Sequence, residues 1–170
     1  EQYYRNLLRA QRNEPIRIHI LPYAQTLAGE AEQNLRRILE LSFDNAPQIE
    51  LAATIAPGGE DNLNGLPAKL AQATQLVALF DLTATPEAEY HGAFLSALTA
   101  AQVPVIIVVN ESSFASRFRE YPQRLTERRE AWTCFARTLQ QNPLFFDLVS
   151  PHIASYVTAL RSSIDELTAA

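Results

Sequence analysis

The chain has 170 residues, 47% of them hydrophobic, and carries 14 Lys and Arg against 19 Asp and Glu. This length suits one well-buried core, so we predict a single α/β domain over residues 1–170. The formal net charge of -5 argues against nucleic acid as a partner. No run approaches the roughly eighteen consecutive apolar residues of a membrane-spanning helix. The lack of methionine predicts a piece cut from a longer polypeptide.

The first half of the chain alternates strand and helix patterns. Residues 16–21 alternate like a strand that lies near a sheet edge, and His19 within it is expected to be partly buried and structural. Residues 29–43 have helical apolar spacing, and residues 49–55 form a second predicted strand. A run of turn-forming residues over 56–62 follows, and it predicts a long loop.

The second half contains the strongest strand signals. Residues 75–80 and 103–109 are nearly continuous apolar runs, which is typical of central parallel strands covered on both faces. Between them, a helix is expected from Thr85 to about residue 101, because Thr85-Pro86-Glu87 has the residues of a helix start.

After residue 110, a charged stretch leads into an apolar helical face over 131–139, which predicts one long helix or a broken pair of helices with the break at Pro122. Cys134 lies on this predicted helix and is expected to be a small core residue; as a single cysteine it fits a reducing compartment. A fifth strand over 144–149 and a final helix from Pro151 complete the pattern. The sequence therefore predicts a three-layer, mainly parallel sheet of five or six strands with helices on both faces, Rossmann-like or GTPase-like.

In such a sheet, ligands bind beyond the carboxyl ends of the strands. The polar or aromatic residues that follow predicted strands there, and form the candidate ligand crevice, are Tyr23, Asp81, Asn110, Glu111, Ser112 and His152. Asp81 and Glu111, joined by Glu60 or Asp61, would offer oxygen ligands to Mg²⁺, although carboxylates at turns more often serve as caps. Ser112 with His152 or His91, oriented by Asp81, would form a hydrolytic triad, but no nucleophile-elbow motif surrounds the serine.

The order of elements over residues 16–167 resembles that of the P-loop GTPases. Residues 75–85 resemble the strand that ends in Val-Asp-Ala-Thr, and residues 105–110 resemble the strand leading to the base-reading Asn-Lys-x-Asp motif. The functional groups do not carry over. Residues 22–29 lack the phosphate-binding lysine and its hydroxyl neighbour, and Glu111 and Ser113 replace the Lys and Asp of the base-reading motif. The resemblance thus implies a degenerate GTPase-like scaffold.

Residues 108–114, 117–118 and 124–132 also resemble the soluble C-terminal part of an uncharacterised bacterial membrane-protein family. Members of that family carry transmembrane helices upstream and are often encoded beside a GTPase-domain protein. The resemblance implies a domain on the cytoplasmic face, tethered to the bacterial inner membrane by the rest of the chain, with a GTPase-domain protein as partner.

Together these features favour a non-catalytic protein-interaction or regulatory domain without a cofactor. The charged 114–129 segment mixes aromatic residues and arginines as interfaces do, and its candidate interface residues are Phe114, Phe118, Tyr121 and Arg128. The alternative hypothesis is a small-ligand-binding or hydrolytic domain that uses Asp81, Asn110, Glu111 and His152.

Overall fold

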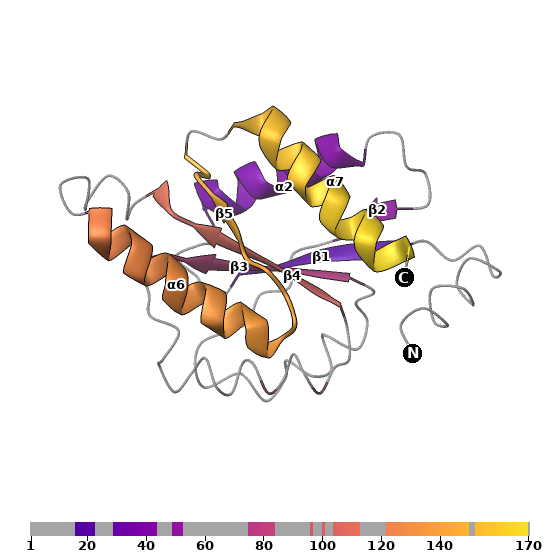
Figure 1. Ribbon diagram of the computed structural model, residues 1–170. Helices are drawn as coiled ribbons and strands as arrows, with labels where there is room; N and C mark the ends of the chain where they lie inside the picture. The colour runs from indigo at the N-terminus through magenta and orange to yellow at the C-terminus, as the bar shows by residue number, and fades with distance from the viewer. Residues whose placement is uncertain are drawn as a thin grey trace, which may run out of the picture.

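The computed structural model describes residues 16–22, 29–43, 49–52, 75–83, 104–112, 122–149 and 152–169, together with residues 96 and 100. Figure 1 shows a central sheet with helices above and below it. The strands are β1 (Ile16–Pro22), β2 (Ile49–Leu51), β3 (Gln75–Asp81), β4 (Val105–Asn110) and β5 (Leu144–Phe146). The helices are α2 (Glu30–Ser42), α6 (Pro122–Thr138) and α7 (Ile153–Ala169).

The five strands lie in the order β2-β1-β3-β4-β5, and every adjacent pair is parallel. This confirms the predicted α/β class. The order is one of the two common arrangements of doubly wound sheets, in which the direction of winding changes between β1 and β3. β1 is not an edge strand, but β2 pairs only with Ile16, Arg17 and Ile18, so the second half of β1 pairs with β3 alone among the described strands.

β3 and β4 are central, as their sequences predict. All six residues of β4 and the first six of β3 are buried. Because side chains alternate along a strand, Val77 and Leu79 face one helical layer while Phe80 faces the other. A continuous apolar run is therefore required to fill both interfaces.

Helices α2 and α7 cover the first face of the sheet (Figure 1). α2 contributes Leu35, Ile38 and Leu39, which follow the i, i+3, i+4 spacing of an amphipathic helix. Leu160 of α7 joins the same apolar cluster. Arg161 donates from Nε to the carbonyl of Ser42 at 2.6 Å, so it satisfies a carbonyl group at the end of α2 that the helix itself leaves unpaired.

Helix α6 covers the opposite face through three aromatic rings. Trp132 is fully buried, and its ring centroid lies 4.9 Å from that of Phe80 and 5.4 Å from that of Phe135. The prediction for Cys134 is wrong, because its side chain is exposed. Trp132, Phe135 and Ala136 share the buried face, and a residue two positions after Trp132 lies about 200° around the helix, facing outward.

The ends of α6 follow from two residues. Pro122 starts the helix, where its missing N–H costs no hydrogen bond. At the other end Gln140 has φ of 58°, Gln141 N–H donates to Ala136 and Gln140 N–H donates to Arg137. This is a Schellman motif with glutamine at the left-handed position that usually holds glycine.

Of the predicted elements, the helix over 85–101, apart from residues 96 and 100, the loop over 56–62 and the last part of the second strand, residues 53–55, lie outside the described residues. The fifth strand ends at Phe146 and is therefore shorter than the predicted 144–149, because the amide of Leu148 bonds to a side chain. Within the described part of the chain, no helix combines the length and apolarity that crossing a membrane requires.

We expect Gln140→Gly to stabilise the protein. Glycine adopts a positive φ without the steric penalty of a Cβ atom, so the free energy of unfolding should rise by about 1 kcal/mol. Urea unfolding followed by the fluorescence of the single Trp checks this. Gln140→Ala is the matched control and should give no gain, because alanine keeps the Cβ atom. Equal effects of the two substitutions would contradict this explanation.

Candidate functional site

The polar residues predicted to gather at the carboxyl ends of the strands do so for β3 and β4. Asp81 ends β3, Asn110 ends β4, and the two are direct partners in the strand register. Asn110 is buried, with 4% of its surface exposed, whereas Asp81 is half-buried. Two neighbouring parallel strands thus end in side chains that face a common position.

The carboxamide of Asn110 bonds to both neighbouring strand ends. Its Nδ2 donates to Asp81 Oδ2 at 3.4 Å, and its Oδ1 accepts from the backbone N–H of Leu148 at 3.1 Å. Oδ1 also accepts from the N–H and hydroxyl of Ser112, at 3.3 and 3.0 Å. One buried side chain therefore connects the ends of β3 and β4 with the residues just after β5.

These bonds explain why β5 ends early. The N–H of Leu148 is taken by Asn110 Oδ1, and the N–H of Asp147 donates to Tyr156 Oη at 2.8 Å. By alternation the Leu148 amide is the one that would face β4 next after Phe146, and because it is bound to Asn110 Oδ1 the chain leaves the strand ladder after Phe146. The apolar run to residue 149 could not reveal this, because the competing acceptors lie elsewhere in the sequence.

Asp81 also organises the turn that follows it. Its Oδ1 accepts from the N–H and the hydroxyl of Thr83, at 2.9 and 2.6 Å. A carboxylate that accepts from the backbone two residues later is a local turn-forming arrangement. Both oxygens of Asp81 thus accept hydrogen bonds from within the fold, which is the capping role weighed against a metal-binding role.

Glu111 is paired with a residue of α6. Arg129 Nε and Nη2 donate to its two carboxylate oxygens at 2.7–2.9 Å, and the Arg129 guanidinium also lies 5.7 Å from the centroid of the Phe145 ring. The Glu111 side chain is 16% exposed and that of Arg129 is 42% exposed. This two-pronged ion pair fastens α6 to the end of β4.

Arg128, a predicted interface residue, also binds the fold itself. Its Nη1 donates to the carbonyl groups of Leu82 and Thr83, at 3.3 and 2.9 Å. Consecutive arginines of α6 therefore hold the ends of two different strands. The other predicted interface residues, Phe114, Phe118 and Tyr121, lie outside the described residues, as does Tyr23 of the candidate crevice.

The described contacts do not assemble a hydrolytic triad. The hydroxyl of Ser112 donates to Asn110 Oδ1. His152 is exposed at the start of α7, where its carbonyl accepts from the N–H of Tyr156. His91 lies outside the described residues, while His19 is half-buried in β1, as predicted.

In the described part of the chain, no three His, Cys, Asp or Glu side chains lie close enough together to hold a metal ion. Glu60 and Asp61, the predicted companions of Asp81 and Glu111, lie outside the described residues.

Sequence reasoning missed Arg129, Thr83 and the Leu148 amide as partners of the site. Thr83 follows Asp81 by two residues, so the Asp-x-Thr spacing was a usable signal. Arg129 lies in a run of mixed charges typical of a solvated helix, and its partner is 18 residues away, so no local pattern identified it.

Comparison with known proteins adds no relative: no protein-family model matches the chain, and neither does any curated protein sequence.

We predict that Asn110→Asp destabilises the fold. A carboxylate could still accept from Ser112 and Leu148, but it would place a second negative charge beside Asp81 and lose the donor to Asp81 Oδ2. The free energy of unfolding should fall by about 2 kcal/mol. Adding Asp81→Asn restores a donor between the two side chains, so the double variant should recover most of the loss in urea unfolding. Simple additivity of the two substitutions would contradict the proposed pairing.

For the Glu111–Arg129 pair, Arg129→Lys should cost about 1 kcal/mol, since an ammonium group cannot bond both carboxylate oxygens in the same planar geometry. The loss should shrink when Glu111→Gln is already present. A double-mutant cycle measured by urea unfolding at low and high salt checks both points. A coupling energy near zero at low salt would mean that the ion pair does not fasten α6.

Proposed function

We propose that this chain is a non-catalytic, GTPase-like α/β domain that acts as a protein-interaction or regulatory module. The observation that supports the proposal is that the polar side chains at the strand ends are bound to other groups of the fold. Asp81, Asn110 and Ser112 bond to one another, and Glu111 is bound by Arg129. A catalytic or phosphate-binding site needs such groups directed at a ligand.

The role of Asn110 supports a GTPase-like origin. This residue matches the asparagine of the base-reading motif, and the segment after β5 corresponds to the Ser-Ala-Lys loop in the proposed resemblance. In this chain the Asn110 carboxamide bonds to Leu148 of that segment and to Asp81. A structural role of this kind explains how the asparagine can be present while the lysine, the aspartate and the phosphate-binding loop are missing. The strand order is compatible with this origin, but it is shared by proteins of unrelated function.

The place of the domain in the cell follows only from the membrane-protein resemblance. On that basis we propose that the rest of the polypeptide tethers it to the cytoplasmic face of the bacterial inner membrane. A GTPase-domain protein is then the proposed partner, and a domain that has lost nucleotide chemistry would contribute a binding surface.

Nucleotides should leave the thermal stability of the purified domain unchanged. A ligand that binds only the folded state at a concentration of 100 times its Kd adds about 2.7 kcal/mol. For a domain of this size that corresponds to a rise in Tm of about 5 °C or more. We therefore expect no rise with GTP, GDP or ATP in the presence of Mg²⁺, measured by differential scanning fluorimetry, with Mg²⁺ and inorganic phosphate alone as controls.

A nucleotide-specific rise in Tm would overturn the non-catalytic proposal and favour the alternative small-ligand-binding or hydrolytic function. Asp81→Asn and Glu111→Gln would then locate the ligand. Loss of the rise in these variants assigns the ligand to the carboxyl ends of β3 and β4, whereas an unchanged rise assigns it elsewhere.

A further inference from the structure

Among the described strands β5 lies at the edge of the sheet, and its outer side offers few backbone groups for strand addition. Glu111 N–H donates to the carbonyl of Phe146, so the backbone groups of Phe146 point toward β4 and those of Phe145, by alternation, point away from it. On the same outer side, Pro143 has no N–H to offer, and the N–H of Asp147 is already bound by Tyr156 Oη. Within the described part of the chain, the groups that remain on this side are the N–H and carbonyl of Phe145 and the carbonyl of Pro143, so this three-residue strand could pair with only a short extended segment.

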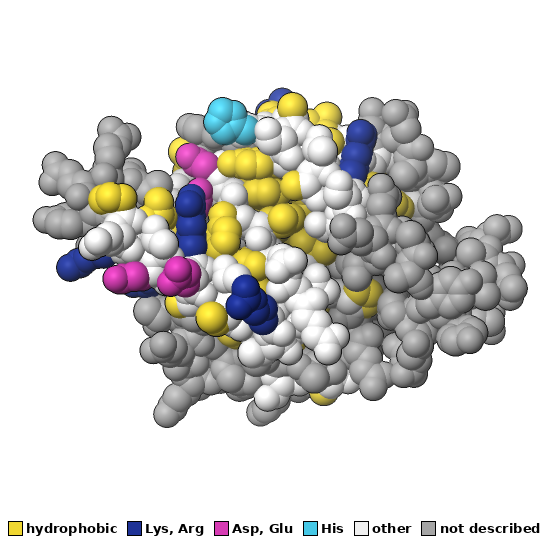
Figure 2. Space-filling model, viewed as in Figure 1, with side chains coloured by type: hydrophobic (Ala, Val, Ile, Leu, Met, Phe, Trp, Pro, Cys, Tyr) yellow, Lys and Arg dark blue, Asp and Glu magenta, His cyan; other side chains and the backbone are white. Residues whose placement is uncertain are grey.

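The same region nevertheless presents apolar side chains. We name the half-buried Leu144, Phe145 and Tyr156 the β5 surface. Figure 2 shows hydrophobic atoms uncovered over β5, between α6 and α7. The connection after β5 adds Val149, which is 54% exposed. Adjoining apolar side chains that stay partly exposed provide a contact area for another molecule.

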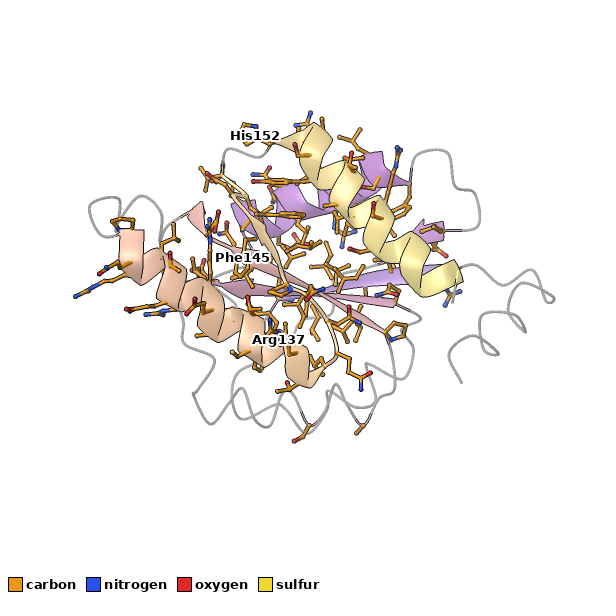
Figure 3. The ribbon with its side chains drawn as sticks, in the orientation of Figure 1. Arg137, Phe145 and His152 are labelled. Atoms are coloured by element: carbon orange, nitrogen blue, oxygen red, sulfur yellow. The ribbon has the colours of Figure 1, made fainter. Side chains whose placement is uncertain are left out.

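Polar groups stand at both ends of the β5 surface. In Figure 3, Phe145 lies between Arg137, near the end of α6, and His152, at the start of α7. Both side chains are exposed, and neither forms a hydrogen bond or ion pair within the described part of the chain. Arg128 and Arg129 differ from these two residues, because Arg128 donates to the Thr83 carbonyl and Arg129 to the Glu111 carboxylate. The guanidinium of Arg137 and the imidazole of His152 are both suited to binding a carboxylate.

We infer that the β5 surface docks an amphipathic helix of a partner protein, with acidic residues of that helix bound by Arg137 and His152. This inference rests on the proposed interaction function and names the surface and the chemistry of the partner. The occupant should be helical because β5 is only three residues long, so a longer extended segment would leave most of its own backbone groups unpaired. A segment that buries its backbone here must satisfy its own N–H and C=O groups, as a helix does.

Synthetic peptides test the inference directly. The probe is a fluorescein-labelled helical peptide with Leu along one face and Glu in its first and last turns. A second peptide replaces each Glu by Lys, and a third carries central prolines that prevent helix formation. In fluorescence anisotropy with the purified domain, we expect saturable binding of the acidic helix alone, weakening as salt is added.

Substitutions by glutamate locate the binding. Arg137→Glu and His152→Glu should each weaken the acidic peptide by about fivefold, because each replaces a hydrogen-bond donor for the peptide carboxylates with a group that repels them. Arg37→Glu on α2 is the matched control, since Arg37 is also exposed, and it should leave binding unchanged. All three positions are exposed, so the variants are expected to fold, and circular dichroism checks that each of them does.

Four results would overturn the inference: no binding of the acidic helix, equal binding of the lysine or proline peptide, equal weakening by Arg37→Glu, or self-association of the domain through this surface. The last is detected by sedimentation of wild-type and Arg137→Glu protein. None of these outcomes depends on nucleotide binding. If the peptide experiment fails and nucleotides leave the Tm unchanged, only the role of the β5 surface is rejected. A nucleotide-specific rise in Tm would reject the proposed function itself.

Discussion

The buried carboxamide of Asn110 sets the arrangement of the strand ends. It lies at the end of β4 with 4% of its surface exposed, where an unpaired amide would be costly. Its acceptor oxygen takes the Leu148 N–H and its donor meets Asp81, so β3, β4 and the segment after β5 can adopt only positions that keep these bonds. The early end of β5 follows, because the amide that would continue the ladder is bound to Asn110. The placement of α7 follows in part, since Tyr156 binds the preceding amide.

Helix α6 is fixed in a different way on its two sides. Its apolar side packs Trp132 and Phe135 against Phe80, and this contact is strong but has little directional preference. Arg128 and Arg129 add direction, because each must reach a defined set of oxygen atoms at a different strand end. The aromatic contact thus supplies most of the burial, while the arginines select the position of α6 along the sheet.

The fold could be predicted where one physical signal dominates. Continuous apolar runs identified β3 and β4, and the spacing of Leu35, Ile38 and Leu39 identified α2, because burial on defined faces dictates those patterns. The prediction for Cys134 was wrong because its apolar neighbours suggested a core position, whereas the phase of the helix turns it outward. The end of β5 and the Glu111–Arg129 pair depend on residues far apart in sequence. Only the packed structure brings them together.

The candidate site shows why residue type alone is weak evidence for chemistry. Asp81, Asn110, Glu111 and Ser112 are the residue types found in catalytic and nucleotide-binding sites, and the topology brings them to the correct edge of the sheet. The difference lies in their partners. Reorienting Glu111 toward a ligand would break a two-pronged ion pair, and reorienting Asn110 would leave the Leu148 amide without its acceptor. Arg137 and His152 bear no such cost, because no described side chain depends on them. Since binding energy is reduced by every bond that must first be broken, the exposed ends of the β5 surface are better suited to a partner than the strand ends are.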